Sequence, residues 1–231
     1  MHDDIEKDIY REINYTPLTL FGEKLNIGII GGGKAALIKI QSFYKKKSYI
    51  EVLALDFLDD FNKFDKSRVK LIKGEYNKEF IKDKHLIIIA VDDNNIIKKV
   101  KEDCEKSFKI YIDSSSFREG MGVIPVSRES ENITISVNTK LGNPRGSVMI
   151  ADNIYKDIKK IDKFIKLTSD IRNNLKIDKE VKNQILKFIN TDDCNYFYQC
   201  GKFIDVLRLF YNDEIVEKIT LLGKEEKNKW N

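Results

Sequence analysis

The sequence predicts a doubly wound α/β domain followed by a helical region, and three observations lead to that fold class. Five short apolar runs alternate with other segments up to residue 113, two more strand-like runs follow without a helix between them, and helical periodicity begins near residue 143. Parallel strands linked in this way form a sheet whose two faces are covered. The length of 231 residues allows one large domain or two small ones.

The five apolar runs are nearly continuous, as expected of strands that are buried on both faces. Between the first two lies a segment with apolar residues at positions 36, 37, 40, 43 and 44, which is the spacing of an amphipathic helix. A second helix follows the fourth run, with Asp92 or Asp93 as its N-cap. The runs are LNIGII (25–30), IEVLALD (50–56), RVKLI (68–72), HLIIIAV (85–91) and KIYID (109–113).

After residue 113 the pattern changes. A polar loop, SSSFREGMG, precedes two predicted strands, VIPV (123–126) and ITISVN (133–138). Asn143-Pro144 predicts a helix start, because Asn caps helices well and Pro is tolerated at the first position. Helices are expected from there on. We therefore divide the chain into a sheet domain (1–113), a segment with two strands (114–150) and a helical domain (151–231).

Smaller signals predict the ends of several helices. Asp192 or Asp193 is a suitable N-cap for the aromatic-rich stretch NYFYQCGKFIDVLRLFY, and Asp213 for a final helix. At the N-terminus, Ile5, Ile9 and Ile13 predict a short helix with one apolar face.

The composition excludes several classes of protein. Lys and Arg number 41 against 37 Asp and Glu, a net charge of +4 that is spread evenly along the chain, so nucleic acid is not an expected partner. Cys104, Cys194 and Cys200 form no C-x-x-C, and we expect neither a disulfide framework nor a metal site. No apolar run could span a bilayer and no signal pattern is present, which favours the cytoplasm and no membrane partner.

A glycine cluster carries the first functional signal. Four of the 12 glycines lie in NIGIIGGGKAALIKI, which contains G-x-G-x-x-A between a predicted strand and a predicted helix. In such a motif Gly31 allows a tight turn, Gly33 lets the backbone approach a pyrophosphate, and the helix start offers free N–H groups. The alternative is a tight turn without a ligand. The motif predicts a dinucleotide site at Gly31, Gly32, Gly33, Lys34 and Ala35.

An acidic residue strengthens this prediction. Asp56 ends the second strand 23 residues after Gly33, close to the offset of about 20 expected for the acid that binds a ribose 2′-hydroxyl. Residues 57–60 contain no Arg or Lys for a 2′-phosphate, so the sequence favours NAD over NADP. The alternative for Asp56 is a solvated carboxylate at a strand end. Further cofactor contacts are expected after the fourth strand, at Ala90, Val91 and Asp92.

With these residues described, the sequence resembles the precorrin-2 dehydrogenase family, the NAD-dependent module of siroheme synthases. LTLFGEKLNIGIIGGGKAALIKI (18–40) is similar to the family's opening, and LIIIAVDD (86–93) to its I-A-A-T-D-D turn. IYID (110–113) resembles its N-V-V-D strand end. Pro125 and ITISVNT (133–139) resemble its F-P and T-I-A-I-S-T segments.

The resemblance implies NAD-dependent oxidation of precorrin-2 to sirohydrochlorin, a step towards siroheme or cobalamin. It also implies a homodimer built from a Rossmann domain, a β-containing dimerisation segment and a helical C-terminal region. Asp113 falls at the family's catalytic aspartate, the general base, and Thr139 at its Ser/Thr position. The alternative for Asp113 is a strand-end aspartate that caps the next turn, because three serines follow it.

A precorrin-2 site needs cationic groups, since this substrate carries carboxylates all around its rim and Arg binds carboxylates well. Our candidates cluster between residues 118 and 145, although each of them could also be an ordinary surface residue. Because no His follows His85, chelatase activity is expected to be weak or absent. The candidates are Arg118, Arg128, Thr139, Lys140 and Arg145.

Two other functions stay open at this point. The first is an NAD(P)-binding sensor or module that performs no catalysis. The second is a dehydrogenase for a different substrate, because the segment Lys140–Pro144 and the length between Asp113 and Pro125 differ from the family pattern.

Overall fold

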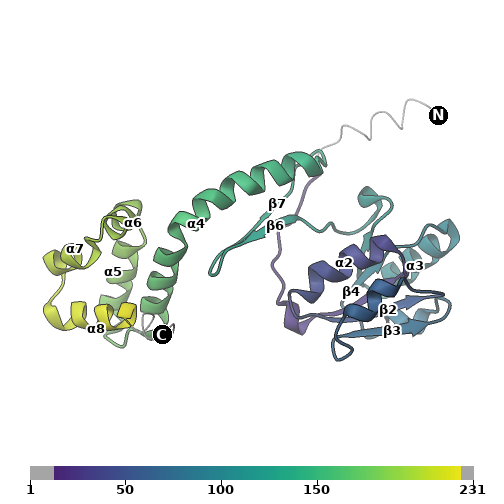
Figure 1. The fold of residues 1–231 in the computed structure, drawn as a ribbon, viewed down its shortest axis with the longest axis horizontal. Coiled ribbons are helices and arrows are strands. Elements are labelled where there is room, and N and C mark those ends of the chain that lie inside the picture. Colours follow the sequence, from purple (N-terminus) through teal and green to yellow (C-terminus); the bar gives the residue numbers. More distant parts are fainter. Residues whose placement is uncertain (1–12, 225–231) are drawn as a thin grey trace. The chain divides into compact units, whose positions relative to one another are not determined.

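The computed structural model describes residues 13–224, which belong to two compact units (Figure 1). The first unit comprises residues 15–124, and the second residues 125–224 together with 13 and 14. The backbone N–H of Ile13 donates to the carbonyl oxygen of Lys140 at 2.8 Å. Apart from Ile13, the predicted N-terminal helix lies outside the described residues. None of the helices within residues 13–224 has the length and apolar character needed to cross a membrane.

A five-stranded parallel sheet forms the centre of the first unit. Its strand order is β3-β2-β1-β4-β5, so the chain moves outward from β1 to β3 and then continues on the other side of β1. This arrangement confirms the predicted doubly wound fold. The strands are β1 (Asn26–Ile30), β2 (Tyr49–Ala54), β3 (Val69–Lys73), β4 (Leu86–Ile89) and β5 (Ile110–Asp113).

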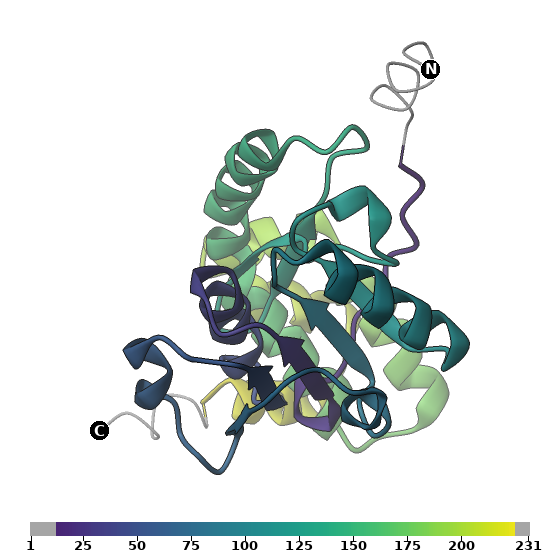
Figure 2. The same ribbon diagram turned by 90° about the vertical axis from the view of Figure 1, so that its right-hand side faces the viewer.

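Helices cover the two faces of the sheet (Figure 2). On one face α2 (Lys34–Tyr44) buries Ala36 and Ile40 against the strands, and on the other α3 (Asn94–Lys106) buries Val100. The β4 residues are at most 6% exposed, which explains why the sequence shows a continuous apolar run there. Asp93 caps α3, as predicted. Short 3₁₀ turns complete the unit: η1 (Gly22–Lys24), η2 (Asp59–Lys63), η3 (Lys78–Ile81) and η4 (Phe117–Glu119).

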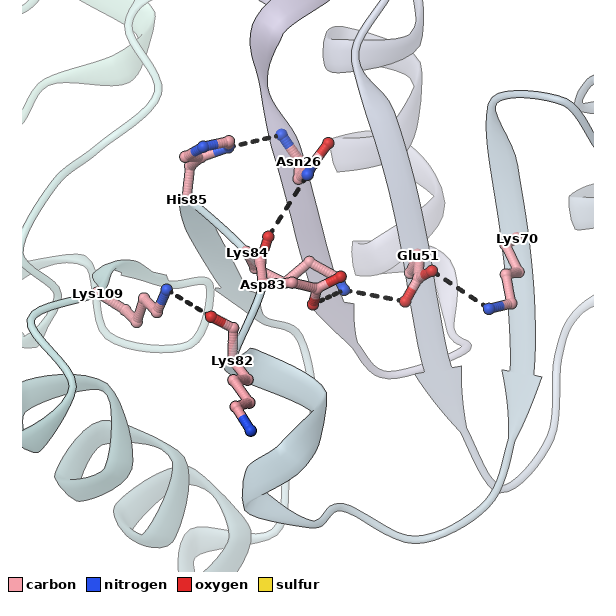
Figure 3. A network of polar contacts seen from close by, with 8 residues as sticks. All are labelled: Asn26, Glu51, Lys70, Lys82, Asp83, Lys84, His85 and Lys109. Carbon is pink, nitrogen blue, oxygen red and sulfur yellow. Dashed lines mark hydrogen bonds and ion pairs between the residues drawn. The ribbon is translucent and has the colours of Figure 1, made fainter.

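A buried lysine lies beside Glu51 of β2, close to the fourth glycine of the cluster, and Figure 3 shows its polar contacts. Lys84 is 3% exposed; its Nζ lies 3.0 Å from Glu51 Oε2 and also pairs with Asp83. Gly28 stands opposite Glu51 in the register of β1 and β2. A Cβ at Gly28 would lie 2.9 Å from Ile87 Cδ1 and 3.2 Å from Lys84 Cγ. Gly28 therefore makes room for Ile87, Phe80 and the lysine stem, and it lies outside the G-x-G-x-x-A motif.

The second unit begins with an antiparallel hairpin of β6 (Val126–Glu129) and β7 (Thr134–Val137). The predicted strand over 123–126 was misplaced, because β6 begins only at Val126. Pro125 has no backbone N–H to donate to a strand ladder, which accounts for a start after the proline.

A long helix, α4 (Pro144–Asn174), runs from the hairpin to the C-terminal helices (Figure 1). Its predicted cap is confirmed, since the Asn143 side chain accepts from Gly146 N at 2.9 Å. Asp162, buried in the middle of this helix, holds the hairpin turn. It accepts from Asn132 N at 3.1 Å and Asn132 Nδ2 at 2.7 Å, and also from the Ser130 hydroxyl.

Four shorter helices pack with the end of α4 around a core that includes Ile171, Ile185 and Leu207. They are α5 (Lys179–Ile189), α6 (Asp192–Gln199), α7 (Phe203–Phe210) and α8 (Asp213–Lys224).

Two predicted caps in this region were wrong. Thr191 caps α6 in place of Asp192 or Asp193, and the Asn212 side chain accepts from Ile215 N at 3.0 Å, the contact expected of Asp213. The aromatic-rich stretch divides between α6 and α7 near Gly201, whose φ is +69°.

Candidate cofactor and catalytic site

The three glycines of the β1–α2 turn have different surroundings. Gly31 has a φ of +122°, and a Cβ there would lie 2.1 Å from the carbonyl oxygen of Ala90. A Cβ at Gly32 would lie 1.9 Å from the carbonyl oxygen of Asp56. A Cβ at Gly33 would meet nothing within 4 Å. The first two glycines let neighbouring strand ends come together, and the third leaves open space in front of the helix.

The start of α2 offers backbone N–H groups without a side-chain cap. Its N-cap is Gly33, and its first turn contains no acidic residue. Lys34 and Ala35 are exposed there. The start of α3 differs, because the Asp93 carboxylate accepts from two of its backbone N–H groups. An uncapped helix start behind a glycine turn fits the pyrophosphate of a dinucleotide.

Asp56 lies at the same edge of the sheet, two residues beyond β2. Its side chain is 89% exposed and can accept hydrogen bonds from a ribose. Lys73 Nζ lies 3.4 Å from Asp56 Oδ1, since Ala54 and Lys73 are opposite each other in β2 and β3. Lys73 lies outside residues 57–60, where the sequence shows no cation beside Asp56. The signal was a lysine that ends the neighbouring strand.

The residues after β4 complete this edge. Ala90 N donates to Ile30 O at 2.8 Å, which holds the end of β4 beside the end of β1. Ala90 and Val91 are half-buried and Asp92 is exposed. The strand order reverses between β1 and β4, and ligands of doubly wound sheets bind at that point. The structure thus brings the predicted cofactor residues to one edge, at the ends of β2, β1 and β4.

Asp113 ends β5 and is buried, with a side chain that is 1% exposed. Its Oδ2 lies 2.6 Å from Lys101 Nζ. Its Oδ1 accepts from Ser115 N at 2.8 Å, from Ser115 Oγ at 2.6 Å and from Ser116 N at 3.0 Å. Burial raises the pKa of Asp113, but these contacts outweigh it and lower the pKa to about 2. Asp113 is therefore ionised at neutral pH.

The loop 114–122 folds back over this aspartate. Met121 N donates to Tyr111 O at 3.0 Å, and a Cβ at Gly120 would lie 2.9 Å from Asp113 N. Lys101 Nζ also lies 2.8 Å from Glu119 Oε2 in the loop. The serine contacts form the turn cap that was considered as the alternative for Asp113. The sequence did not reveal Lys101 and Glu119, because their meeting depends on how α3 and the loop pack on β5.

Of the candidate substrate residues, Arg118 belongs to the first unit and Arg128 to the second. The guanidinium carbon of Arg118 lies 5.6 Å from the centre of the Phe117 ring. Arg128 Nε lies 2.7 Å from Asp152 Oδ1, so this arginine already has a carboxylate partner.

The other three candidates lie together in the turn before α4 and in its first turn. Thr139 Oγ1 accepts from Asn143 N at 2.6 Å, and the hydroxyl thereby closes the turn. The Lys140 carbonyl binds Ile13, and Arg145 is exposed in the first turn of α4. Within residues 13–224, no three His, Cys, Asp or Glu side chains gather as a metal site would require.

Comparison with known proteins decides the class of the first unit. Residues 19–126 match the family model described as "Putative NAD(P)-binding". The match spans 108 of the 231 residues and is a likeness of the first unit to NAD(P)-binding domains. This match confirms the predicted nicotinamide cofactor and agrees with the open helix start at Gly33 and the exposed acid at Asp56.

One solved structure extends the likeness to the second unit. The protein described as "SirC, precorrin-2 dehydrogenase" superposes with a TM-score of 0.65 at 18% identity, covering 91% of this chain and 100% of that one. At this identity the likeness shows the fold, and it confirms the predicted Rossmann-like sheet, strand pair and helical C-terminal region. Together with the family match, it supports the resemblance seen in the sequence.

A structure described as D-2-hydroxyisocaproate dehydrogenase is more distant. It has a TM-score of 0.32 at 14% identity and covers 48% of this chain and 31% of that one, which is too little for an argument. Among curated proteins, none matches the sequence.

Proposed function

We propose that the protein catalyses the NAD-dependent oxidation of precorrin-2 to sirohydrochlorin. The observation that carries this proposal is the likeness to SirC precorrin-2 dehydrogenase, which spans the whole length of that chain and therefore includes the hairpin and the helical region. The NAD(P)-binding domain and the motifs around residues 31, 90 and 113 support it.

The cofactor would bind at the edge formed by β2, β1 and β4. The start of α2 behind Gly33 would hold the pyrophosphate, and Asp56 would accept hydrogen bonds from the adenosine ribose. When bound, NAD supplies the hydride acceptor. NAD is preferred over NADP because the exposed carboxylate of Asp56 repels a 2′-phosphate. Lys73, 3.4 Å from that carboxylate, weakens the repulsion without removing it.

Oxidation of the reduced ring also removes a proton from the substrate, and Asp113 is our candidate general base. Its carboxylate is ionised and stands at the end of β5. Because the side chain is 1% exposed, the loop 114–122 must move before a substrate can reach it. A carboxylate with a pKa of about 2 is a weak proton acceptor, and Asp113 becomes a stronger one when the loop moves and its contacts with Ser115 and Ser116 loosen.

The proposed substrate contacts use the cationic groups found near the hairpin and the loop. Arg118, Lys140 and Arg145 would meet rim carboxylates, and Arg128 would exchange Asp152 for one of them. Thr139 would donate its hydroxyl once it no longer serves the turn.

We also propose a homodimer that uses the first half of α4. Four apolar side chains on this segment are partly exposed: Val148 at 40%, Met149 at 61%, Ile150 at 37% and Ile154 at 41%. Exposed apolar side chains gathered on one helical segment are typical of a protein contact.

Chelatase activity is proposed to be weak or absent. A chelatase would need Asp113 as a base or a transient metal ligand, but the ammonium group of Lys101 lies 2.6 Å from its Oδ2. That positive charge disfavours a divalent cation at the same carboxylate.

The deciding experiment is anaerobic incubation with precorrin-2 and NAD+, following the absorbance of sirohydrochlorin. Asp113→Asn should abolish turnover, while Asp157→Asn, at an exposed aspartate of α4, should leave it unchanged. Absence of turnover with both NAD+ and NADP+ in a folded protein would refute the proposal.

The burial of Asp113 favours one second candidate, an NAD(P)-binding module that performs no catalysis. In that case the protein would bind NAD+ in a direct titration and yet show no turnover. Asp113 would then serve as the cap of the turn at Ser115 and Ser116.

A further inference from the structure

Lys101 connects two carboxylates at the end of β5. Its Nζ lies 2.6 Å from Asp113 Oδ2 and 2.8 Å from Glu119 Oε2, and its side chain is 15% exposed. The lysine belongs to the middle of α3, where the neighbouring Val100 and the nearby Cys104 are fully buried in the core. Its backbone is therefore fixed relative to the sheet.

We propose that Lys101 is a positioning residue that keeps Asp113 ionised and oriented, and that ties the loop 114–122 to the same ammonium group through Glu119. This inference rests on the proposed function, because it gives Lys101 a role in the reaction through Asp113. It adds a residue that no motif of the sequence indicates.

The two oxygens of Asp113 have different partners, and this difference carries the argument. The donors from Ser115 and Ser116 all reach Oδ1. The contact that the structure shows for Oδ2 is the ammonium group of Lys101. Without it, half of a buried carboxylate would face no opposite charge, and such a group takes up a proton instead.

Among the described residues, Lys101 is the cation whose contact lowers the pKa of Asp113. Strand β4, beside β5, contributes only Leu and Ile. On α3, Glu105 accepts from the Tyr111 hydroxyl at 2.9 Å, and burial raises the pKa of Cys104 to about 12. On η4, Arg118 lies against the Phe117 ring. The charged groups linked to the Asp113 carboxylate are thus Lys101 and, through Lys101, Glu119.

The sharing of Lys101 also links the loop to the carboxylate. Glu119 is 67% exposed, so its side chain can move with the loop, while Asp113 and Lys101 are held by β5 and α3. When the loop closes, Glu119 anchors Lys101 in place over Asp113. The same interaction breaks when the loop opens.

The test measures the pKa of Asp113 directly, by the pH dependence of its side-chain carboxyl carbon signal in nuclear magnetic resonance. In the unaltered protein, the signal should titrate near pH 2. Lys101→Met should raise this pKa by about one unit or more, since a nearby cation lowers an Asp pKa by about 1–3 units. Lys101→Arg should keep it low. Lys98→Met, at an exposed lysine of the same helix, is the matched control and should leave the pKa of Asp113 unchanged.

Glu119→Gln distinguishes the effect of the Lys101 cation on Asp113 from the effect of the loop. It retains the contact between Lys101 and Asp113, so the pKa of Asp113 should not rise, while the backbone amides of residues 114–122 should exchange faster with solvent. A rise as large as that in Lys101→Met would assign the effect to the loop and overturn the proposal. Unchanged titration of Asp113 in folded Lys101→Met would overturn it as well, and Lys101→Gln provides the same measurement if the Met variant does not fold.

Kinetics then connects the residue to the reaction. The acid limb of kcat/KM for precorrin-2 oxidation should move upward in Lys101→Met together with the measured pKa, and Lys101→Arg should restore it. If the unaltered protein oxidises no precorrin-2, the proposed function fails, but the titration of Asp113 still decides the role of Lys101 in holding the carboxylate.

Discussion

Alanine substitutions in the β1–α2 turn test the cofactor site most sharply, because the structure assigns each glycine a different outcome. Gly31→Ala would place a Cβ 2.1 Å from the carbonyl oxygen of Ala90 and force alanine to a φ of +122°. Such backbone strain costs about 1–3 kcal/mol, and the clash with a backbone oxygen adds to it. We expect the free energy of unfolding of the first unit to fall by about 3 kcal/mol, or about 12 °C in Tm at about 4 °C per kcal/mol.

Gly33→Ala should have the opposite profile. A Cβ there meets nothing within 4 Å, and the φ of −92° suits alanine, so the free energy of unfolding should change by less than about 0.5 kcal/mol. The added methyl group nevertheless occupies the space through which the pyrophosphate approaches the helix start. Affinity for NAD+ should fall about tenfold or more, which corresponds to about 1.4 kcal/mol.

Thermal unfolding and isothermal titration with NAD+ measure these two effects separately. Gly74→Ala is the control, because its Cβ would meet only Leu53 Cδ1 at 3.9 Å and the residue lies outside the proposed site. Unchanged NAD+ affinity in Gly33→Ala would show that the pyrophosphate does not bind at the start of α2. Equal stability of Gly31→Ala and Gly33→Ala would refute the argument from backbone strain.

Further predictions concern stability. Phe108 has a φ of +51° and is 94% exposed. Phe108→Gly removes about 1–2 kcal/mol of backbone strain and adds a backbone entropy cost of about 0.5–1 kcal/mol, so Tm should stay the same or rise. A lower Tm would contradict this expectation. Asp162→Ala leaves the hairpin donors unpaired and should cost about 1–3 kcal/mol in urea unfolding. Lys84→Met should also cost about 1–3 kcal/mol, because Glu51 then loses the nearer of its two ion-pair partners among the described residues. An unchanged urea midpoint would argue against a structural role of the ion pair. Because the pKa of Asp113 is about 2 when folded, below its usual 3.8, its contribution is complete above about pH 4 and is lost as the pH falls towards 2; Asp113→Asn should flatten that part of an acid unfolding curve.

The sequence was sufficient for the sheet because its strands are buried on both faces. The run at 86–89 contains only Leu and Ile, and its short length between turn signals favours a buried strand over a buried helix. The glycine motif likewise located the β1–α2 turn, since a φ of +122° at Gly31 favours glycine. The start of α4 followed from Asn143 and Pro144, because Asn is a strong N-cap residue and Pro is favoured at the first helical position.

Other features depend on contacts that a linear pattern does not contain. Asn212 caps a helix as well as the adjacent Asp213 does, and Thr191 caps α6 although Asp is the stronger N-cap residue, so intrinsic preference could not choose the right neighbour. Lys73 reaches Asp56 through the register of β2 and β3, and Lys101 reaches Asp113 through the packing of α3 on β5. Both lysines are ordinary surface residues in the sequence and acquire a partner only in the fold.

The length of α4 has a consequence for how this unit tolerates change. With 31 residues and a rise of about 1.5 Å each, the helix is about 46 Å long, and each residue turns it by about 100°. Asp162 binds the hairpin turn, while Phe164, two residues later, packs in the core of the C-terminal helices. One residue inserted between them would rotate the C-terminal core about the helix axis by more than a quarter turn relative to the hairpin. The continuous helix therefore sets an angle as well as a distance, and insertions are expected at its ends and in the loops that follow, where they leave this angle unchanged.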